Sequence, residues 1–379
     1  MESHGVFEQG PIRPPSEASS LLLRVTRNCA WNRCNFCSIY KRKKFSLRPV
    51  EDIMRDIDQI YSLVQEFQED GKVPGSQSRK SAAVEEHSFY AARNWFAEGM
   101  ESIFLQDADS LVIRPEKLIQ VLKHIRTRFP SVARITSYAR SDSVARISDE
   151  HLLELAAAGL NRIHIGMETA SDQILRMVNK GVTKAIHIKA GLKAKNAGIE
   201  LSEYVLTGIG GRQFSREHAI ETADALSQIN PDFIRFRTLR IPDSVRLFES
   251  PEGFEYQWSP DLVQAQEILL LIEHLEGITS CIRSDHMYNL FQEIDGHLPR
   301  DKERLSDILR AYIGMDAGLR ALFQVGKRAG HFLRLSDMEI PRRMEQVEEI
   351  CRKGGITADN VDVQIHEMIQ EQMRRGMPS

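Results

Sequence analysis

Between residues 20 and 240, short apolar runs alternate with longer stretches in which apolar residues recur every three or four positions. The runs are rich in Ile, Leu, Val or Phe and are bounded by glycine or polar turn residues, which is typical of buried strands. They cover residues 21–25, 102–105, 134–137, 162–167, 201–206 and 233–239. Strands that alternate with helices predict an α/β fold with a parallel sheet, either open and doubly wound or curved like a barrel. In both forms ligands bind at the carboxyl ends of the strands.

The stretches between the strands carry helix signals. One apolar helical face comprises Ile53, Ile57, Ile60 and Val64. This spacing places all four side chains on the side of a helix that faces a core. Ser148 is expected to be an N-cap, and Thr183 is expected to begin a later helix. Thr169 and Asp172 have the spacing of a capping box.

The pattern changes after residue 245, where the chain becomes mostly helical and strongly charged. We therefore expect an N-terminal extension, a β/α core and a mostly helical C-terminal region, over residues 1–19, 20–245 and 246–379. Proline and glycine predict a linker over 242–260, before a helix over 262–275 and a candidate strand over 278–282. Residues 70–81, rich in Gly and Ser, are expected to form a flexible excursion in the first crossover.

Composition limits the classes of function. The 379 residues include 50 basic and 53 acidic side chains, and the net charge of −3 does not indicate binding to nucleic acid. No apolar run approaches the roughly 18 residues that span a bilayer. The N-terminus has neither a basic start nor an apolar stretch, so a secretory signal is not expected. We expect a cytoplasmic protein that does not bind a membrane.

Three of the five cysteines lie within nine residues, directly after the first predicted strand. They are Cys29, Cys34 and Cys37, whereas Cys281 and Cys351 stand alone. A small and odd number of cysteines does not suit a disulfide scaffold, and thiols kept reduced in the cytoplasm suit a metal or catalytic site. A 4Fe–4S cluster normally takes four cysteines, so three local thiolates would leave one iron open to a substrate.

Other interpretations of this loop remain open. A structural zinc site would need a fourth ligand, from Cys281, Cys351 or a histidine. An electron-transfer iron–sulfur module would also need a fourth protein ligand, which either distant cysteine could provide. The third alternative is a group of buried cysteines that binds no metal.

The loop resembles the cysteine motif of the radical S-adenosylmethionine (radical SAM) enzymes, in which an aromatic residue precedes the third cysteine. Phe36 has that place before Cys37, although four residues separate Cys29 from Cys34 where the family usually has three. Residues 163–171 and 179–183 resemble the branch that contains the tRNA methylthiotransferases and the oxygen-independent coproporphyrinogen dehydrogenases. The resemblance covers residues 20–240 and implies a six-stranded parallel β/α partial barrel with a mainly helical C-terminal region.

The resemblance also implies cofactors and site residues. Cys29, Cys34 and Cys37 would hold a 4Fe–4S cluster whose fourth iron chelates S-adenosyl-L-methionine (SAM). The cluster would cleave SAM to form a 5′-deoxyadenosyl radical that acts on the substrate. The residues implied to contact SAM are Phe36, Gly208 and Ile209 near adenine, Asp107 or Asp109 at the ammonium, Arg140 at the carboxylate and Glu168 at the ribose or amino acid. Carboxylates accept from ammonium groups, and guanidinium groups hold carboxylates bidentately.

The implied partners are a substrate, which the sequence does not identify, and an electron donor such as flavodoxin or ferredoxin. The chain has no second cysteine cluster of the auxiliary iron–sulfur kind. The functional alternative is a non-catalytic zinc or iron–sulfur protein on the same fold. Metal content would separate the two, because an enzyme needs an open coordination position.

Overall fold

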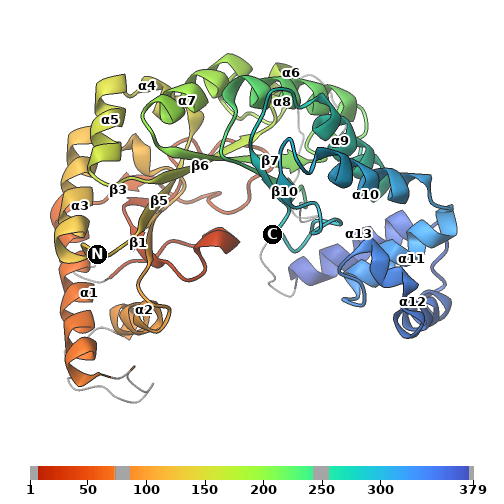
Figure 1. Ribbon diagram of the computed structural model, residues 1–379, viewed down its shortest axis with the longest axis horizontal. Coiled ribbons are helices and arrows are strands. Elements are labelled where there is room, and N and C mark those ends of the chain that lie inside the picture. Colours follow the sequence, from red (N-terminus) through yellow and green to blue (C-terminus); the bar gives the residue numbers. More distant parts are fainter. Residues whose placement is uncertain (1–6, 72, 74–85, 242–255, 375–379) are drawn as a thin grey trace. The chain divides into compact units, whose positions relative to one another are not determined.

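The computed structural model describes residues 7–71, 73, 86–241 and 256–374 (Figure 1). Within these residues, eight strands form one sheet in the order β1-β4-β5-β6-β7-β8-β9-β10. They are β1 (Leu21–Arg24), β4 (Ser102–Gln106), β5 (Arg134–Ala139), β6 (Arg162–Glu168), β7 (Glu200–Thr207), β8 (Phe233–Thr238), β9 (Cys281–Arg283) and β10 (Gly296–His297). A separate antiparallel pair joins β2 (Thr26–Arg27) to β3 (Ser46–Leu47).

All six predicted strands are present, as β1 and β4 to β8. Strand β4 pairs in parallel with β1 and β5, and β5 pairs in parallel with β6. Strand β9 pairs in parallel with β8. The candidate strand over 278–282 is confirmed in the shorter form of β9, beside which β10 runs antiparallel. The predicted parallel α/β sheet is therefore confirmed, and two further strands extend it beyond the predicted six.

Helices connect the strands and make up most of the C-terminal region. They are α1 (Val50–Asp70), α2 (Glu86–Ala97), α3 (Pro115–Arg128), α4 (Ser141–Arg146), α5 (Asp149–Ala157), α6 (Asp172–Met177), α7 (Lys184–Asn196), α8 (Ser215–Ile229), α9 (Asp261–His274), α10 (Lys302–Gly314), α11 (Ala317–Arg328), α12 (Pro341–Gly354) and α13 (Val361–Arg374). Short 3₁₀ helices are η1 (Pro15–Glu17), η2 (Ser110–Val112) and η3 (Leu335–Glu339). The predicted helix over 262–275 is α9, and the helical C-terminal region is confirmed.

Two of the predicted helix starts are confirmed and one is wrong. Ser148 Oγ accepts from the His151 amide, as an N-cap does. Thr183 Oγ1 accepts from the amide three residues ahead, at 3.4 Å. The N-cap of α6 is Ser171, not Thr169, because the Oγ of Ser171 accepts from the Ile174 amide at 3.2 Å. Thr169 instead accepts from the Ser171 amide at 3.1 Å, so it stabilises the turn that leads into the helix.

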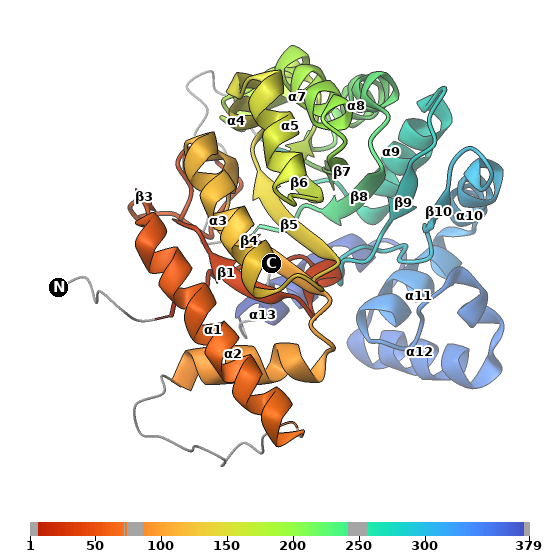
Figure 2. The same cartoon turned by 60° about the vertical axis from the view of Figure 1, so that its left-hand side comes forward.

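The described chain divides into two compact units. Unit 1 comprises residues 1–32, 39–166 and 189–202, and unit 2 comprises residues 33–38, 167–188 and 203–379. In unit 1, α1 packs against α2 and α3 (Figure 2), and its predicted apolar face is buried. In unit 2, α9 packs against α8 and α10, and α11 packs against α12 and α13.

Parts of two sequence predictions lie outside the described residues. The excursion expected over 70–81 is described only at 70, 71 and 73, and most of the linker expected over 242–260 is likewise not covered. Among the described helices, none combines the length and the apolar character that crossing a membrane requires.

Candidate functional site

In unit 1, a buried carboxylate fastens the start of the cysteine loop. Asp107 follows β4, and its Oδ2 accepts from the Asn28 amide at 2.9 Å and from Arg24 Nη2 at 2.8 Å. The Tyr40 hydroxyl donates to the other carboxylate oxygen. Asp107 has no exposed surface, so these donors replace the water that its charge would otherwise need. The backbone just before Cys29 is therefore held to the carboxyl end of β4.

The loop residues after Cys29 are also held within unit 1. The Asn32 amide donates to the Cys29 sulfur at 3.4 Å, and Asn32 Nδ2 donates to the Tyr40 carbonyl at 2.6 Å. Arg140, after β5, places its guanidinium carbon 5.5 Å from the Trp31 ring centroid. Arg140, predicted from the sequence, thus lies against the cysteine loop.

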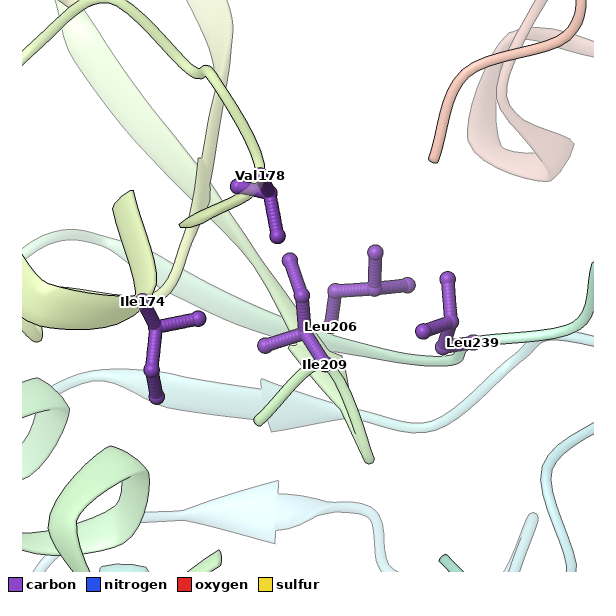
Figure 3. Packing of buried hydrophobic residues seen from close by; sticks show 5 residues of the cluster. All are labelled: Ile174, Val178, Leu206, Ile209 and Leu239. Atoms are coloured by element: carbon purple, nitrogen blue, oxygen red, sulfur yellow. The ribbon is translucent and has the colours of Figure 1, made fainter. Parts of the chain in front are cut away.

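The second half of the loop is held by unit 2. The Asn35 amide donates to the Val178 carbonyl at 2.9 Å, and Asn35 Nδ2 donates to the Met177 carbonyl at 3.1 Å. Phe36 packs against a buried apolar cluster. The cluster comprises Ile174, Val178, Leu206, Ile209 and Leu239 (Figure 3). The structure therefore brings together Phe36 and Ile209, both predicted to lie near adenine.

Glu168 ends β6 in an unusual backbone conformation. Its φ is 64°, in the left-handed region that side-chain-bearing residues rarely adopt. Its Oε1 accepts from Lys180 Nζ at 3.0 Å, and the same ammonium lies 5.8 Å from the Phe36 ring centroid. The ion pair is mostly buried, with side-chain exposures of 9% for Lys180 and 16% for Glu168. Lys180 thus forms a salt bridge with the predicted Glu168 and contacts the ring of Phe36, which precedes the third cysteine.

Sequence reasoning missed Glu203, an acid inside the apolar strand β7. Its side chain is fully buried, and neither carboxylate oxygen has a hydrogen-bond partner within the described part of the chain. Burial raises its pKa well above the ordinary value, Lys180 opposes that rise, and Glu168 adds to it. A single charge within an apolar run was the signal that could have identified it. Glu203 therefore joins Lys180 and Glu168 in one set of electrostatically linked groups.

Asp109, the alternative to Asp107 for the SAM ammonium, is a helix cap. Its Oδ1 accepts from the Leu111 amide at 3.2 Å at the start of η2, and its Oδ2 accepts from Ser143 Oγ at 2.6 Å. Burial raises its pKa to about 6, against the opposing hydrogen bond from Ser143. Both candidate carboxylates thus have donors of their own in unit 1.

Hydrogen bonds hold both the amide and the carbonyl group of Gly208, in the turn after β7. Gly208 has a φ of 80°, which glycine adopts without a side-chain clash. Its amide donates to Glu267 Oε1 at 2.8 Å, and its carbonyl accepts from the Tyr256 hydroxyl at 2.7 Å. Burial raises the pKa of Glu267 to about 8, so the carboxyl group is mainly protonated at neutral pH. Helix α9 thereby fixes the turn that is predicted to lie beneath adenine.

The cysteine side chains of the loop are of the chemical type that binds iron–sulfur clusters. None of the five cysteines forms a disulfide; Cys34 is buried, and both Cys29 and Cys37 are partly exposed. Within the described residues, no three His, Cys, Asp or Glu side chains are grouped so as to hold a metal ion. Burial raises the pKa of Cys281 and of Cys351, which disfavours the thiolate that a fourth ligand would need. The three loop cysteines therefore stay a sequence prediction as the donor set, and neither distant cysteine is favoured as a fourth ligand.

A family model described as the radical SAM superfamily matches residues 84–226. The match includes the predicted residues Asp107, Asp109, Arg140, Glu168, Gly208 and Ile209, and it begins after the cysteine loop. It confirms the resemblance to this superfamily over that part of the chain. No curated protein matches the chain in sequence.

Several solved structures are similar to the chain. One is the radical S-adenosylmethionine methyltransferase TsrM from Kitasatospora setae, at 15% identity and a TM-score of 0.39, with 56% of this chain and 35% of that chain covered. Methylornithine synthase (PylB) has 16% identity and a TM-score of 0.42, with 76% and 69% covered. Coproporphyrinogen III oxidase (HemN) from Escherichia coli, a radical SAM enzyme, has 15% identity and a TM-score of 0.40, with 64% and 50% covered. All three TM-scores lie below 0.5.

Proposed function

Since residues 84–226 match the radical SAM superfamily, we propose that the chain is an enzyme of this superfamily that cleaves SAM reductively. The observation that carries the proposal is the loop with Cys29, Cys34 and Cys37, none of them in a disulfide, directly after the first parallel strand. These residues would hold a 4Fe–4S cluster. When bound, such a cluster supplies the electron that cleaves SAM, and the resulting 5′-deoxyadenosyl radical takes a hydrogen atom from the substrate.

The protein's own contribution is to hold the loop backbone beside the cysteines before the cofactor arrives. Asp107 holds the backbone ahead of Cys29, and the Asn32 amide donates to its sulfur. Asn35 fastens the backbone between Cys34 and Cys37 through two hydrogen bonds to carbonyl groups of unit 2. A loop anchored in this way loses less conformational freedom on binding, which favours affinity.

The SAM-binding roles are part of the same proposal. Phe36 and Ile209 belong to one apolar environment that suits the flat face of adenine, and the Gly208 turn lies next to Ile209 in sequence. Arg140 offers a guanidinium group for the SAM carboxylate. For the ammonium group, Asp107 or Asp109 supplies a carboxylate, and Glu168 supplies one for the ribose or amino acid. An electron donor such as flavodoxin or ferredoxin would deliver the electron.

Anaerobic reconstitution with iron and sulfide tests the proposal. We expect about four irons and four sulfides per chain and formation of 5′-deoxyadenosine from SAM under reduction. Alanine variants of Cys29, Cys34 or Cys37 should lose the cluster. The matched controls are Cys281→Ala and Cys351→Ala, which should keep it because these buried thiols lie on β9 and α12.

Three results would contradict the proposal. A fully loaded cluster that forms no 5′-deoxyadenosine would remove the enzymatic role and leave a non-catalytic iron–sulfur protein. Loss of the cluster in Cys281→Ala or Cys351→Ala would indicate a fourth protein ligand and hence an electron-transfer module. One zinc ion per chain in an anaerobic preparation would indicate a metal-binding protein without redox chemistry.

A further inference from the structure

Two buried arginines share one carboxylate near the carboxyl end of β8. Arg240 lies two residues beyond this strand, and Arg328 is the last residue of α11. Arg240 Nη2 donates to Asp261 Oδ1 at 3.2 Å, while Arg328 Nη2 donates to the two oxygens of Asp261 at 3.1 and 3.2 Å. The side chains of Arg240, Arg328 and Asp261 are 3%, 4% and 2% exposed. Two positive charges and one negative charge are thus buried together.

The two guanidinium groups have unused donors. Within the described residues, Nε and Nη1 of Arg240 and of Arg328 are buried and have no hydrogen-bond partner. Buried donors are nearly always paired, and buried charges are nearly always balanced, because leaving either without a partner costs free energy. Four buried donor nitrogens on two cations are the complement of an oxyanion, since hydrogen bonds from guanidinium groups to carboxylate or phosphate are charge-assisted.

Two neighbouring side chains add a hydroxyl group and an aromatic face to this place. The Tyr288 hydroxyl is buried and, among the described residues, has no hydrogen-bond partner. Its pKa is raised by burial and lowered by the charge of Arg240, which puts the hydroxyl within electrostatic reach of that guanidinium. The Trp258 ring centroid lies 6.0 Å from the Arg240 guanidinium carbon and covers it with an aromatic surface. A hydroxyl donor and an aromatic wall accompany the two cations.

The second acid in this region interacts with side chains other than Arg240 and Arg328. Asp362 lies on α13. Its pKa is raised mainly by burial and also by the negative charge of Asp261. Its carboxylate is therefore less readily ionised than an ordinary aspartate. Its pKa is lowered by Arg212 and by a hydrogen bond from Gln324, so these two side chains are its partners. Asp261 remains the acid that hydrogen-bonds to Arg240 and Arg328.

The position of the pair indicates a ligand rather than a purely structural network. Parallel α/β sheets bind their ligands at the carboxyl ends of the strands, and Arg240 follows β8 at such an end. Arg328 comes from α11, in the C-terminal helical region, to which no function was assigned from the sequence. We propose that Arg240 and Arg328 bind an oxyanion, a carboxylate or a phosphate, that is part of the substrate. The assignment to the substrate rests on the proposed function, whereas binding of the anion does not.

Anion binding to the full chain, without SAM or cluster, tests this site directly. Inorganic phosphate and malonate are titrated separately at constant ionic strength, with chloride as the balancing ion, and followed by calorimetry and by the melting temperature. We expect saturable binding of at least one of them and a rise in melting temperature, because a ligand that binds the folded state stabilises it. Phosphate binding indicates a phosphorylated substrate, and malonate binding indicates a carboxylic acid.

Variants separate a binding site from a structural network. Arg240→Gln and Arg328→Gln should each weaken the binding of the anion at least about tenfold, by removing one charged fork. Arg240→Lys keeps the charge but loses the fork, so it should bind with intermediate affinity. Asp261→Asn should bind the anion more tightly than the wild type, because it removes the carboxylate that competes for the same donors. Arg310→Gln is the control, since Arg310 is 43% exposed and pairs with surface acids.

The proposal is overturned if neither anion binds to the wild type, or if folded Arg240→Gln or Arg328→Gln binds as the wild type does. Should these two variants fail to fold, Arg240→Lys and Asp261→Asn decide. Unchanged affinity in both would show that the arginines serve structure alone. Because the assay contains no SAM, its failure leaves the proposed SAM cleavage untouched, and a chain that binds the anion but cleaves no SAM fails only the proposed function.

Discussion

Replacing Glu267 by glutamine should change how stability depends on pH. The pKa of Glu267 is raised by burial to about 8 from an ordinary 4.5. The folded state therefore binds more protons than the unfolded state between these values, so the free energy of unfolding falls as pH rises through this range. A difference of about 3.5 pKa units corresponds to roughly 5 kcal/mol over the whole range. Glutamine cannot ionise, and its carbonyl can still accept from the Gly208 amide.

Urea unfolding of wild type and Glu267→Gln at several values between pH 5 and 9 measures this effect. We expect the two proteins to have similar stability near pH 5 and the variant to be more stable at pH 9, by up to about 5 kcal/mol. The matched control is Glu276→Gln, an exposed acid just beyond the same helix, whose profile should follow the wild type. Parallel profiles for wild type and Glu267→Gln would refute a neutral carboxyl group at this position.

Three further substitutions test the local structure. Gly208→Ala forces a side chain into a left-handed backbone, where a Cβ would also meet Ser259 Cβ at 3.4 Å, and should cost about 1–2 kcal/mol in urea unfolding and raise the KM for SAM. Ser171→Ala removes the N-cap of α6 and should cost about 1 kcal/mol in thermal unfolding, whereas a capping role for Thr169 would make this change neutral. Asp109→Asn replaces a buried carboxyl with a pKa of about 6, and should remove a fall of about 3 kcal/mol in unfolding free energy between pH 3.8 and 6, measured by urea titration.

The sheet could be predicted from the sequence because parallel strands are buried on both faces. Runs such as residues 102–105 and 162–167 are nearly continuous in apolar residues, and both became strands with mostly buried side chains. The cap of α6 could not be predicted in the same way. Thr169 and Ser171 are both hydroxyl residues near the helix start, and only the path of the backbone decides which oxygen meets the free amides.

The candidate site was partly predictable, for a different reason. Cys29, Cys34 and Cys37 could be predicted as one set from their spacing alone, because ligands of one metal centre are often close in sequence. Glu203 and Lys180 were missed, since the burial of one and the ion pair of the other depend on packing that no local pattern encodes. The pair of Arg240 and Arg328 comes from distant parts of the sequence, and its meeting at Asp261 follows only from the fold.

Electron paramagnetic resonance of the reduced, reconstituted protein, recorded with and without SAM, tests the central claim most directly. A cluster held by Cys29, Cys34 and Cys37 alone leaves one iron accessible, so adding SAM should change the g values of the signal. Spin quantitation should show that the same cluster gives both spectra. A fully loaded cluster whose spectrum is identical with and without SAM would contradict the account, since it would mean that the fourth iron already has a protein ligand.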